Sequence, residues 1–181
     1  MFARTARLTL RPGWPEDASA LTQAIAHEEV VTNLARAPWP YTLDDAEEFL
    51  ARPREADAPK FVILSHEADY PRIVGSIAMW FEEDSFEFGY WLTPSAWGRG
   101  YATEAGHAVL QMARHALGVR RVRAGHFVDN PASGRVLTKL GFRPTGAVVP
   151  RHSRARGVDA PCAVFELDLD EGRMCDVKMA A

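Results

Sequence analysis

Two glycines just ahead of a predicted helix form the strongest chemical signal in the sequence. They are Gly98 and Gly100, in a loop that follows a strand-like segment and opens a helix predicted over 98–117. Glycine allows backbone torsions and close approaches that a side chain would prevent. The first turn of a helix presents unpaired N–H groups and a partial positive charge, which together bind phosphate. The pattern predicts a phosphate site to which Arg99 adds charge, although a tight strand-to-helix turn would have the same sequence.

Two common phosphate loops do not account for these glycines. A P-loop requires Gly-x4-Gly-Lys-Ser/Thr, and the chain has no such run. A dinucleotide-binding fold has its glycines after the first strand of a parallel sheet. Here the glycines follow a predicted antiparallel hairpin, with strands over 73–81 and 85–92 joined by the acidic turn 82–84. The loop therefore belongs to another class of fold.

A second motif combines Asn130, Pro131 and Ser133 at the start of a shorter predicted helix. Asparagine is a favoured helix N-cap, and proline is favoured at the first helical position. Capping alone is a sufficient explanation for Asn130. Ser133 lies in the first turn, where a solvent-facing role near the unpaired amides is the simplest interpretation.

The remaining elements place both motifs in a mixed sheet. Their order is strand, two helices, three strands, helix, strand, helix and two strands. This order begins as an antiparallel meander and then changes to strand–helix–strand units, which favour parallel pairing. The prediction is an α/β fold with a mixed, mainly antiparallel central sheet and helices on both faces. The other predicted strands cover 5–11, 60–65, 120–127, 142–149 and 160–169, and the other helices begin near 15 and 42.

Length and composition restrict the class of protein. The chain has 181 residues, 47% of them hydrophobic, and a net charge of -3. We predict one domain over 1–170 and a flexible tail over 171–181. The charge balance argues against a nucleic-acid surface, no apolar run suits a membrane span, and the first residues lack a secretory signal. With two cysteines and no disulfide or metal spacing, a cytoplasmic protein without a metal is expected.

Five segments together resemble the GNAT superfamily of N-acetyltransferases, in particular the branch of the Rim-type ribosomal-protein N-terminal acetyltransferases. The resemblance implies the GNAT acyl-CoA transferase fold, acetyl-CoA as co-substrate, and commonly a homodimer. Ser95 departs from the superfamily pattern, which usually has Gln or Arg there. In the order of the family, the segments are Arg7–Pro12, Pro40–Thr42, Gly89–Leu92, Trp97–Ala105 and Asn130–Phe142.

The resemblance also implies where acetyl-CoA binds. Backbone N–H groups of the glycine loop (residues 97–102) would hold the pyrophosphate, and the strand over 89–93 would bind the pantetheine arm. One amide of that strand would hold the thioester carbonyl, where negative charge develops. The implied CoA-binding residues are Trp91, Leu92, Thr93, Trp97, Gly98, Arg99, Gly100, Tyr101, Ala102, Asn130 and Ser133.

In acyl transfer the amine must lose a proton, and a group that donates a proton to the departing thiolate helps without being essential. By resemblance, Ser133 is the proton donor to the thiolate, with Tyr101 and Tyr90 as alternatives. Glu87 is our candidate base, because strand alternation places it on the face opposite Phe86, Phe88 and Tyr90, beside the predicted acceptor cleft. A solvated position near the hairpin edge explains Glu87 equally well. Weaker candidates for the base are Glu28, Glu29 and His126.

Two further features bear on the acceptor. Trp39 and Tyr41 lie between prolines and are predicted to form a rigid wall of the acceptor site, or an ordinary hydrophobic anchor. A basic cluster of Arg151, His152, Arg154 and Arg156 is expected on a solvated hairpin, with an acidic partner or the CoA 3′-phosphate as alternative contacts.

The sequence therefore predicts direct acetyl transfer from acetyl-CoA to a primary amine, without a covalent enzyme intermediate. The acceptor would be a protein N-terminal α-amine, or alternatively a small amine or aminoglycoside. A non-catalytic acyl-CoA-binding sensor or partner module is the competing hypothesis.

Overall fold

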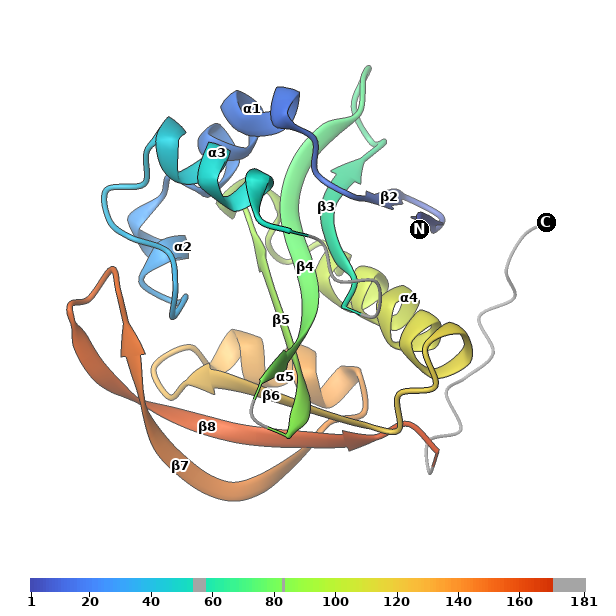
Figure 1. Cartoon of the computed structure of the whole chain (residues 1–181), viewed down its shortest axis with the longest axis vertical. Helices are drawn as coiled ribbons and strands as arrows, with labels where there is room; N and C mark the ends of the chain where they lie inside the picture. Colours follow the sequence, from blue (N-terminus) through green and yellow to red (C-terminus); the bar gives the residue numbers. More distant parts are fainter. Residues whose placement is uncertain (54–57, 83, 171–181) are drawn as a thin grey trace.

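Eight strands form one twisted sheet in the computed structural model, which describes residues 1–53, 58–82 and 84–170 (Figure 1). The strand order is β1-β2-β3-β4-β5-β6-β8-β7. The strands are β1 (Ala3–Arg4), β2 (Leu8–Arg11), β3 (Lys60–Ser65), β4 (Arg72–Glu82), β5 (Ser85–Leu92), β6 (Arg121–Phe127), β7 (Arg143–Ser153) and β8 (Val158–Asp168). The α-helices are α1 (Ala18–Ile25), α2 (Glu28–Val31), α3 (Leu43–Ala51), α4 (Tyr101–Ala116) and α5 (Pro131–Lys139), with short 3-10 turns at Pro15–Asp17 and Pro94–Ala96.

The sheet changes direction at one place. Neighbouring strands from β1 to β5 are antiparallel, as are β6, β8 and β7, whereas β5 and β6 are parallel. The parallel pair is joined through α4, because parallel strands need a crossover connection. The predicted mixed, mainly antiparallel sheet is therefore confirmed.

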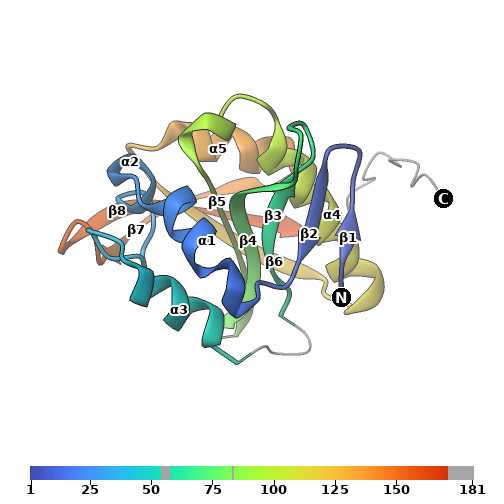
Figure 2. The same ribbon diagram turned by 90° about the horizontal axis from the view of Figure 1, so that it is seen from above.

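Helices cover both faces of the sheet (Figure 2). On one face, α4 and α5 pack on a core that includes Phe88, Val109 and Leu137. On the other face, α1 and α3 pack on a smaller core that includes Leu21 and Leu50. Each strand in the middle of the sheet therefore presents alternate side chains to different cores.

Both short helices near the site begin with the caps that their sequences predict. Thr42 and Asp45 form a capping box at the start of α3, in which the Asp45 carboxylate accepts the Thr42 N–H at 2.8 Å. Asn130 caps α5 through its side-chain oxygen, and Pro131 occupies the first helical position. These caps satisfy N–H groups that a helix start leaves unpaired.

The structure differs from the predicted elements at several ends. The predicted strand over 5–11 begins only at Leu8, because Thr5 forms a turn in which its N–H donates to the Leu8 carbonyl at 2.9 Å. The helix predicted from residue 98 begins at Tyr101, because Gly98 and Gly100 have φ angles of 73° and 79°. Helix α2 was not predicted. The predicted tail over 171–181 lies outside the described residues, among which no helix is long and apolar enough to cross a membrane.

Candidate active site

The site begins where β5 and β6 separate. Their parallel pairing runs from Phe86, opposite Val122, to Phe88, opposite Ala124. The following residues of β5, Gly89–Leu92, pair with β4 on one side only within the described part of the chain. The edge of β5 that faces β6 is thus available there, and an extended ligand can add to such an edge through main-chain hydrogen bonds.

A cavity of about 1630 Å³ occupies this opening. Typical small-molecule sites measure roughly 300–1,000 Å³, so this cavity has room for a large ligand and a second substrate. Its wall extends from the glycine loop, along β5, to α2 and the β7–β8 hairpin. The cavity therefore joins the predicted phosphate site and the predicted acceptor side in one continuous space.

The glycine loop closes the cavity at the start of α4. Gly98 and Gly100 both have positive φ, and a Cβ atom on Gly98 would meet nothing within 4 Å. The Trp97 indole N–H donates to the Leu92 carbonyl at 2.8 Å, which ties the loop to the end of β5. The loop and the first turn of α4 thus present the backbone N–H groups of the predicted phosphate cradle.

Most of the predicted CoA-binding residues line this cavity. They are Trp91, Leu92, Trp97, Gly98, Gly100, Tyr101, Ala102, Asn130 and Ser133. Two do not line it. Thr93 is buried and donates its N–H to the Val74 carbonyl at 2.9 Å. Arg99 forms an ion pair with Glu67 at 2.8 Å, outside the cradle. The charge of Arg99 is therefore partly compensated by a carboxylate, and the cradle consists chiefly of backbone groups.

A partly exposed ion pair links the glycine loop to the turn between β1 and β2. Arg7 contacts the Glu104 carboxylate through Nε at 2.8 Å and Nη2 at 2.6 Å, and its Nη1 donates to the Arg99 carbonyl at 2.9 Å. Burial alone would raise the pKa of Glu104, but hydrogen bonds from Thr5 and Arg7 outweigh it and the pKa lies below its ordinary value. Sequence reasoning matched Arg7 and Glu104 to the family but assigned them no role.

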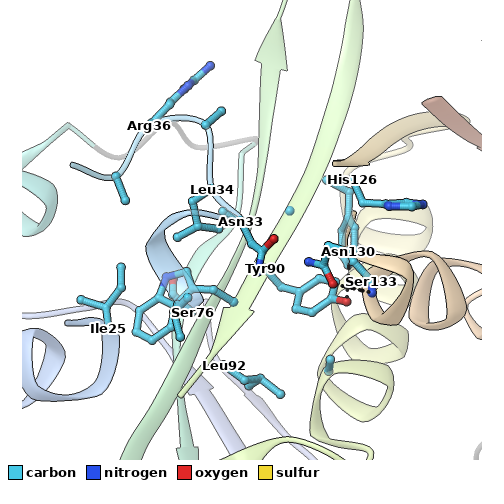
Figure 3. Close-up of a pocket in the computed structure, with 18 of the residues that line it drawn as sticks. Ile25, Asn33, Leu34, Arg36, Ser76, Tyr90, Leu92, His126, Asn130 and Ser133 are labelled. Atoms are coloured by element: carbon cyan, nitrogen blue, oxygen red, sulfur yellow. Dashed lines mark hydrogen bonds between the residues drawn. The ribbon is translucent and has the colours of Figure 1, made fainter. Parts of the chain in front are cut away.

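On the α5 side of the opening, Tyr90, Asn130 and Ser133 point toward one another (Figure 3). The Tyr90 hydroxyl donates to Ser133 Oγ at 3.3 Å, and the Ser133 N–H donates to Asn130 Oδ1 at 3.4 Å. Burial raises the pKa of Tyr90, with a smaller opposing effect of the hydrogen bond to Ser133. The His126 ring points away from this group, and its Nδ1 lies 2.8 Å from the Phe127 carbonyl.

On the opposite face of β5, Glu87 lines the cavity with only 8% of its surface exposed. The Arg151 guanidinium lies 3.8 Å from its carboxylate. Two residues further along, Gly89 is covered by the Trp80 indole, which would lie 3.0 Å from a Cβ atom there. Glu87 therefore occupies a buried position rather than a solvated hairpin edge, beside the place where β5 and β6 separate.

The wall next to Glu87 contains an aromatic and charged group that the sequence did not reveal. Arg36 pairs with Glu82 at 2.6 Å, and its guanidinium lies 5.2 Å from the centre of the Trp80 ring. The Trp80 indole N–H donates to the same Glu82 carboxylate at 3.1 Å. These three residues come from the loop after α2 and from β4, so no local sequence pattern joins them.

Of the two residues predicted to form an aromatic wall of the acceptor site, only one lines the cavity. Tyr41 lines the cavity, and burial raises its pKa to about 12. Trp39 is 41% exposed and does not line the cavity. Of the weaker candidates for the base, Glu29 and His126 line the cavity and Glu28 does not.

The tip of the β7–β8 hairpin bonds to the loop after α2, and we refer to this contact as the hairpin latch (Ser153, Arg154 and Arg156 with residues 32–35). Ser153 Oγ donates to the Leu34 carbonyl at 3.1 Å, and the Arg154 N–H donates to the Ala35 carbonyl at 2.9 Å. Arg156 Nε donates to the Thr32 carbonyl at 2.6 Å. The basic cluster was expected on a solvated hairpin, whereas Arg156 is a structural residue of this contact.

Arg156 also binds the hairpin latch to residues at the end of β6. Its guanidinium pairs with both carboxylate oxygens of Asp129, at 2.7 and 3.1 Å, and lies 4.6 Å from the centre of the Phe127 ring. The latch thereby joins the end of β6 to the loop that carries Arg36, and it borders the cavity on the side predicted for the acceptor. Among the described residues, no group of three or more His, Cys, Asp or Glu side chains is arranged to hold a metal.

The described part of the chain combines a sheet that separates at its parallel pair, a glycine loop at a helix start and a large cavity between them. Residues 7–143 match the family described as acetyltransferase (GNAT) domain, and the chain belongs to this family. It is 27% identical over 148 residues to an uncharacterized N-acetyltransferase of Bacillus subtilis, YnaD, covering 81% of this chain and 85% of that protein. The protein is thus an N-acetyltransferase of the GNAT family.

Solved structures share the fold at low sequence identity. A GNAT-family acetyltransferase from Bacillus anthracis has a TM-score of 0.79 at 22% identity, covering 94% of this chain and 100% of that one. The ribosomal-protein-S5-alanine acetyltransferase of Vibrio fischeri has a TM-score of 0.78 at 15% identity, with 94% and 98% covered. The microcin C7 self-immunity acetyltransferase MccE, in complex with acetyl-CoA and AMP, has a TM-score of 0.74 at 18% identity, with 91% and 93% covered.

Proposed function

We propose that this N-acetyltransferase takes the acetyl group from acetyl-CoA and transfers it directly to a primary amine. The observation that carries the proposal is the continuous cavity, which runs from the glycine loop past the available edge of Gly89–Leu92 to Glu87. The positive φ of Gly98 and Gly100 lets the backbone approach the pyrophosphate closely. The acetyl-CoA complex of MccE, which shares the fold, supports the same ligand here.

One face and one edge of β5 supply the chemistry. Acetyl-CoA provides an activated thioester; a nitrogen–carbon bond forms to the acceptor amine while the carbon–sulfur bond breaks and its electron pair stays on sulfur. Glu87 accepts the proton that the amine loses, directly or through water, because it is a buried carboxylate on the acceptor face. A backbone N–H of Gly89–Leu92 stabilises the negative charge on the carbonyl oxygen.

A protein N-terminal α-amine is the acceptor that we favour. Its pKa of about 8, against about 10.4 for lysine, makes removal of its proton easier for a single carboxylate. The S5-alanine acetyltransferase, a neighbour in fold, supports a Rim-type acceptor, whereas the AMP complex of MccE supports a small-molecule acceptor. The cytoplasmic location stays a prediction from the cysteine content, and the homodimer stays a prediction from the resemblance.

The first experiment is calorimetric titration of the protein with acetyl-CoA and with CoA, followed by thiol release with peptide N-termini, polyamines and aminoglycosides. Saturable binding with acceptor-dependent thiol release is expected, and the acceptor with the highest kcat/KM identifies the substrate class. Binding without thiol release on every acceptor would favour the non-catalytic sensor. No binding of either ligand would refute the phosphate cradle and the proposed function with it.

Glu87→Gln tests the base within the same assay. We expect kcat to fall about 100-fold, as is typical when a general base is removed, with acetyl-CoA affinity unchanged. Glu166→Gln is the matched control, because the Glu166 side chain of β8 is exposed and pairs with Arg123 at the surface. Equal turnover in both variants would remove Glu87 from the mechanism.

A further inference from the structure

We propose that Tyr90 is a positioning residue that holds the Ser133 hydroxyl as a hydrogen-bond donor to the CoA sulfur. This inference rests on the proposed function, because it assigns a task within acetyl transfer. The resemblance implied Ser133 as a proton donor with Tyr90 as an alternative to it. The geometry instead makes the two hydroxyls members of one chain.

Both hydroxyl groups are held in place by their surroundings. The Tyr90 ring packs into the core beneath α4 and α5, with its centre 6.2 Å from that of Phe88. Ser133 is fixed through its main chain, which is bonded to the N-cap Asn130. The 3.3 Å contact between Tyr90 and Ser133 Oγ therefore joins two elements, β5 and α5, on either side of the opening.

The direction of the hydrogen bond determines what Ser133 can do. Each hydroxyl carries one proton, and Tyr90 directs its proton to Ser133 Oγ. The Ser133 proton is then available for another acceptor, and both side chains line the cavity. Burial raises the pKa of Tyr90, so at neutral pH the phenol keeps the proton that it donates to Ser133 Oγ.

The acidities of the groups decide what kind of help the sulfur receives. A free thiol has a pKa of about 8.5, whereas a phenol and an aliphatic hydroxyl are weaker acids. Neither Tyr90 nor Ser133 would give up its proton to a thiolate at equilibrium. They stabilise the developing charge by donating hydrogen bonds, and a chain of two donors polarises the second one. The electron pair of the broken carbon–sulfur bond stays on sulfur, which is later protonated from solvent.

Tyr101 and His126, the other residues considered for proton transfer near the opening, do not belong to this chain of hydroxyl groups. The Tyr101 hydroxyl bonds to Ser65 at 3.0 Å and to Glu67, on the far side of the glycine loop. The His126 ring points away from the group (Figure 3). His126 of β6 and Arg135 and Lys139 of α5 also line the cavity, so their charges affect the absolute pKa of a bound thiol. A comparison among variants removes that common contribution.

The test is a spectroscopic titration of the thiol of enzyme-bound CoA, which needs no turnover. Ser133→Ala should raise the pKa of the bound thiol by about one unit, the size expected when one hydrogen bond to a charged group is lost. Tyr90→Phe should raise it by about half as much. The double variant should match Ser133→Ala, because Tyr90 acts only through Ser133.

Steady-state kinetics provide a second readout of the same variants. Tyr90→Phe should lower kcat about three-fold and Ser133→Ala about ten-fold, with KM for acetyl-CoA changed less than two-fold, because the hydrogen bond strengthens as charge develops on sulfur. Tyr70→Phe is the control: Tyr70 is an exposed tyrosine whose hydroxyl accepts from Arg72. Tyr70→Phe should change neither kcat nor the KM for acetyl-CoA.

A further variant strengthens the hydrogen bond from residue 90 instead of removing it, so the test does not depend on whether Tyr90→Phe folds. 3-Fluorotyrosine at position 90 keeps the ring and makes the phenol a stronger donor, so it should lower the pKa of the bound thiol. An unchanged thiol pKa in all Tyr90 variants, or an additive effect of Tyr90→Phe in the Ser133→Ala background, would overturn the inference while leaving the transferase intact. A wild-type protein that binds no CoA would instead overturn the proposed function, and the inference with it.

Discussion

Replacing Glu104 by glutamine would keep the shape of the side chain and remove the charge that holds the N-terminal strand against α4. The carboxylate accepts hydrogen bonds from Thr5 Oγ1 at 2.5 Å, from the Arg7 N–H at 3.0 Å and from Arg7 Nε at 2.8 Å, and it lies 2.6 Å from Arg7 Nη2. Glutamine offers one oxygen and one NH2 group. Each oxygen of the Glu104 carboxylate accepts from two of these donors. Whichever way the glutamine amide is turned, its NH2 group replaces one of these oxygens, and two donors then face another donor.

The expected loss of stability follows from those two contacts. Hydrogen bonds to charged groups contribute about 1.5–3 kcal/mol each, but the Arg7 side chain is 36% exposed against 18% for Glu104, so solvent screens part of the interaction. We therefore expect Glu104→Gln to lower the free energy of unfolding by about 2–3 kcal/mol. For a chain of this size, that corresponds to a decrease in Tm of about 5–10 °C.

The same change should affect acetyl-CoA binding selectively. Arg7 fixes the glycine loop through the Arg99 carbonyl, so an Arg7 side chain released from Glu104 leaves the loop less ordered. We expect KM for acetyl-CoA to rise about three- to ten-fold, with kcat nearly unchanged, because the loop binds the part of the ligand remote from the reaction.

Urea unfolding and initial-rate kinetics measure both effects. The control is Glu48→Gln, because the Glu48–Arg52 pair is an exposed i,i+4 contact worth about 0.3–0.5 kcal/mol. Glu104→Gln with the stability and the KM of that control would refute the argument that the Arg7–Glu104 pair supports the loop.

Three further predictions concern other parts of the molecule. Gly100→Ala should lower acetyl-CoA affinity several-fold in calorimetry, because a left-handed residue with a side chain costs about 1–2 kcal/mol and the loop would shift to relieve it. Arg156→Ala should raise KM for the acceptor several-fold and lower the free energy of unfolding by about 1–2 kcal/mol, with acetyl-CoA affinity intact, because it removes the anchor of the hairpin latch. Asp17→Asn should destabilise the protein at pH 7 and less so at pH 3 in urea unfolding.

The sign of the Asp17 effect follows from its environment. Burial alone would raise the pKa of Asp17, but the hydrogen bonds from Arg11 and from the Trp14 N–H lower it below its ordinary value. A lowered pKa in the folded state contributes stability that is complete above the unfolded value of about 3.9 and is lost as the pH falls through the folded value. A difference between wild type and Asp17→Asn that did not change between pH 7 and pH 3 would contradict this account.

Matched controls separate local from global effects in the other two predictions. Gly118→Ala imposes a similar strain, at φ 66°, after the far end of α4, and should leave acetyl-CoA affinity unchanged. Arg120→Ala removes an exposed arginine that pairs with Asp170 at 3.5 Å and should affect neither stability nor KM. Loss of acetyl-CoA affinity in Gly118→Ala, or an unchanged acceptor KM in Arg156→Ala, would count against the respective assignments.

Local patterns in the sequence were sufficient for much of the fold. The strands over 60–65 and 85–92 were predicted at their observed bounds, because alternation and the acidic turn lie within a few residues of one another. The helix caps at Thr42 and Asn130 were readable for the same reason. Helix α2 was missed because four residues are too few to show a helical period.

Contacts between distant segments were beyond the reach of those patterns. Tyr90 and Ser133 are 43 residues apart and meet only because β5 and β6 separate. Arg156 bonds to the carbonyl of Thr32, and backbone carbonyls leave no signature in a sequence. The candidate positions of the CoA site followed from the motif and the resemblance, whereas the group formed by Arg36, Trp80 and Glu82 required the folded chain.

The alternation of β5 has a consequence for how such a protein can diversify. Phe88 and Tyr90 belong to the core beneath α4 and α5, whereas Glu87 and Trp91 face the opposite side and Gly89 lies under the Trp80 indole. Under the proposed function, mutations at Glu87 and around Gly89 change the surroundings of the acceptor amine without disturbing the packing that orients the glycine loop. A lineage could exchange one acceptor for another through residues of a single strand while the donor half of the reaction is inherited intact, and directed evolution of new acceptor specificity would begin at that face.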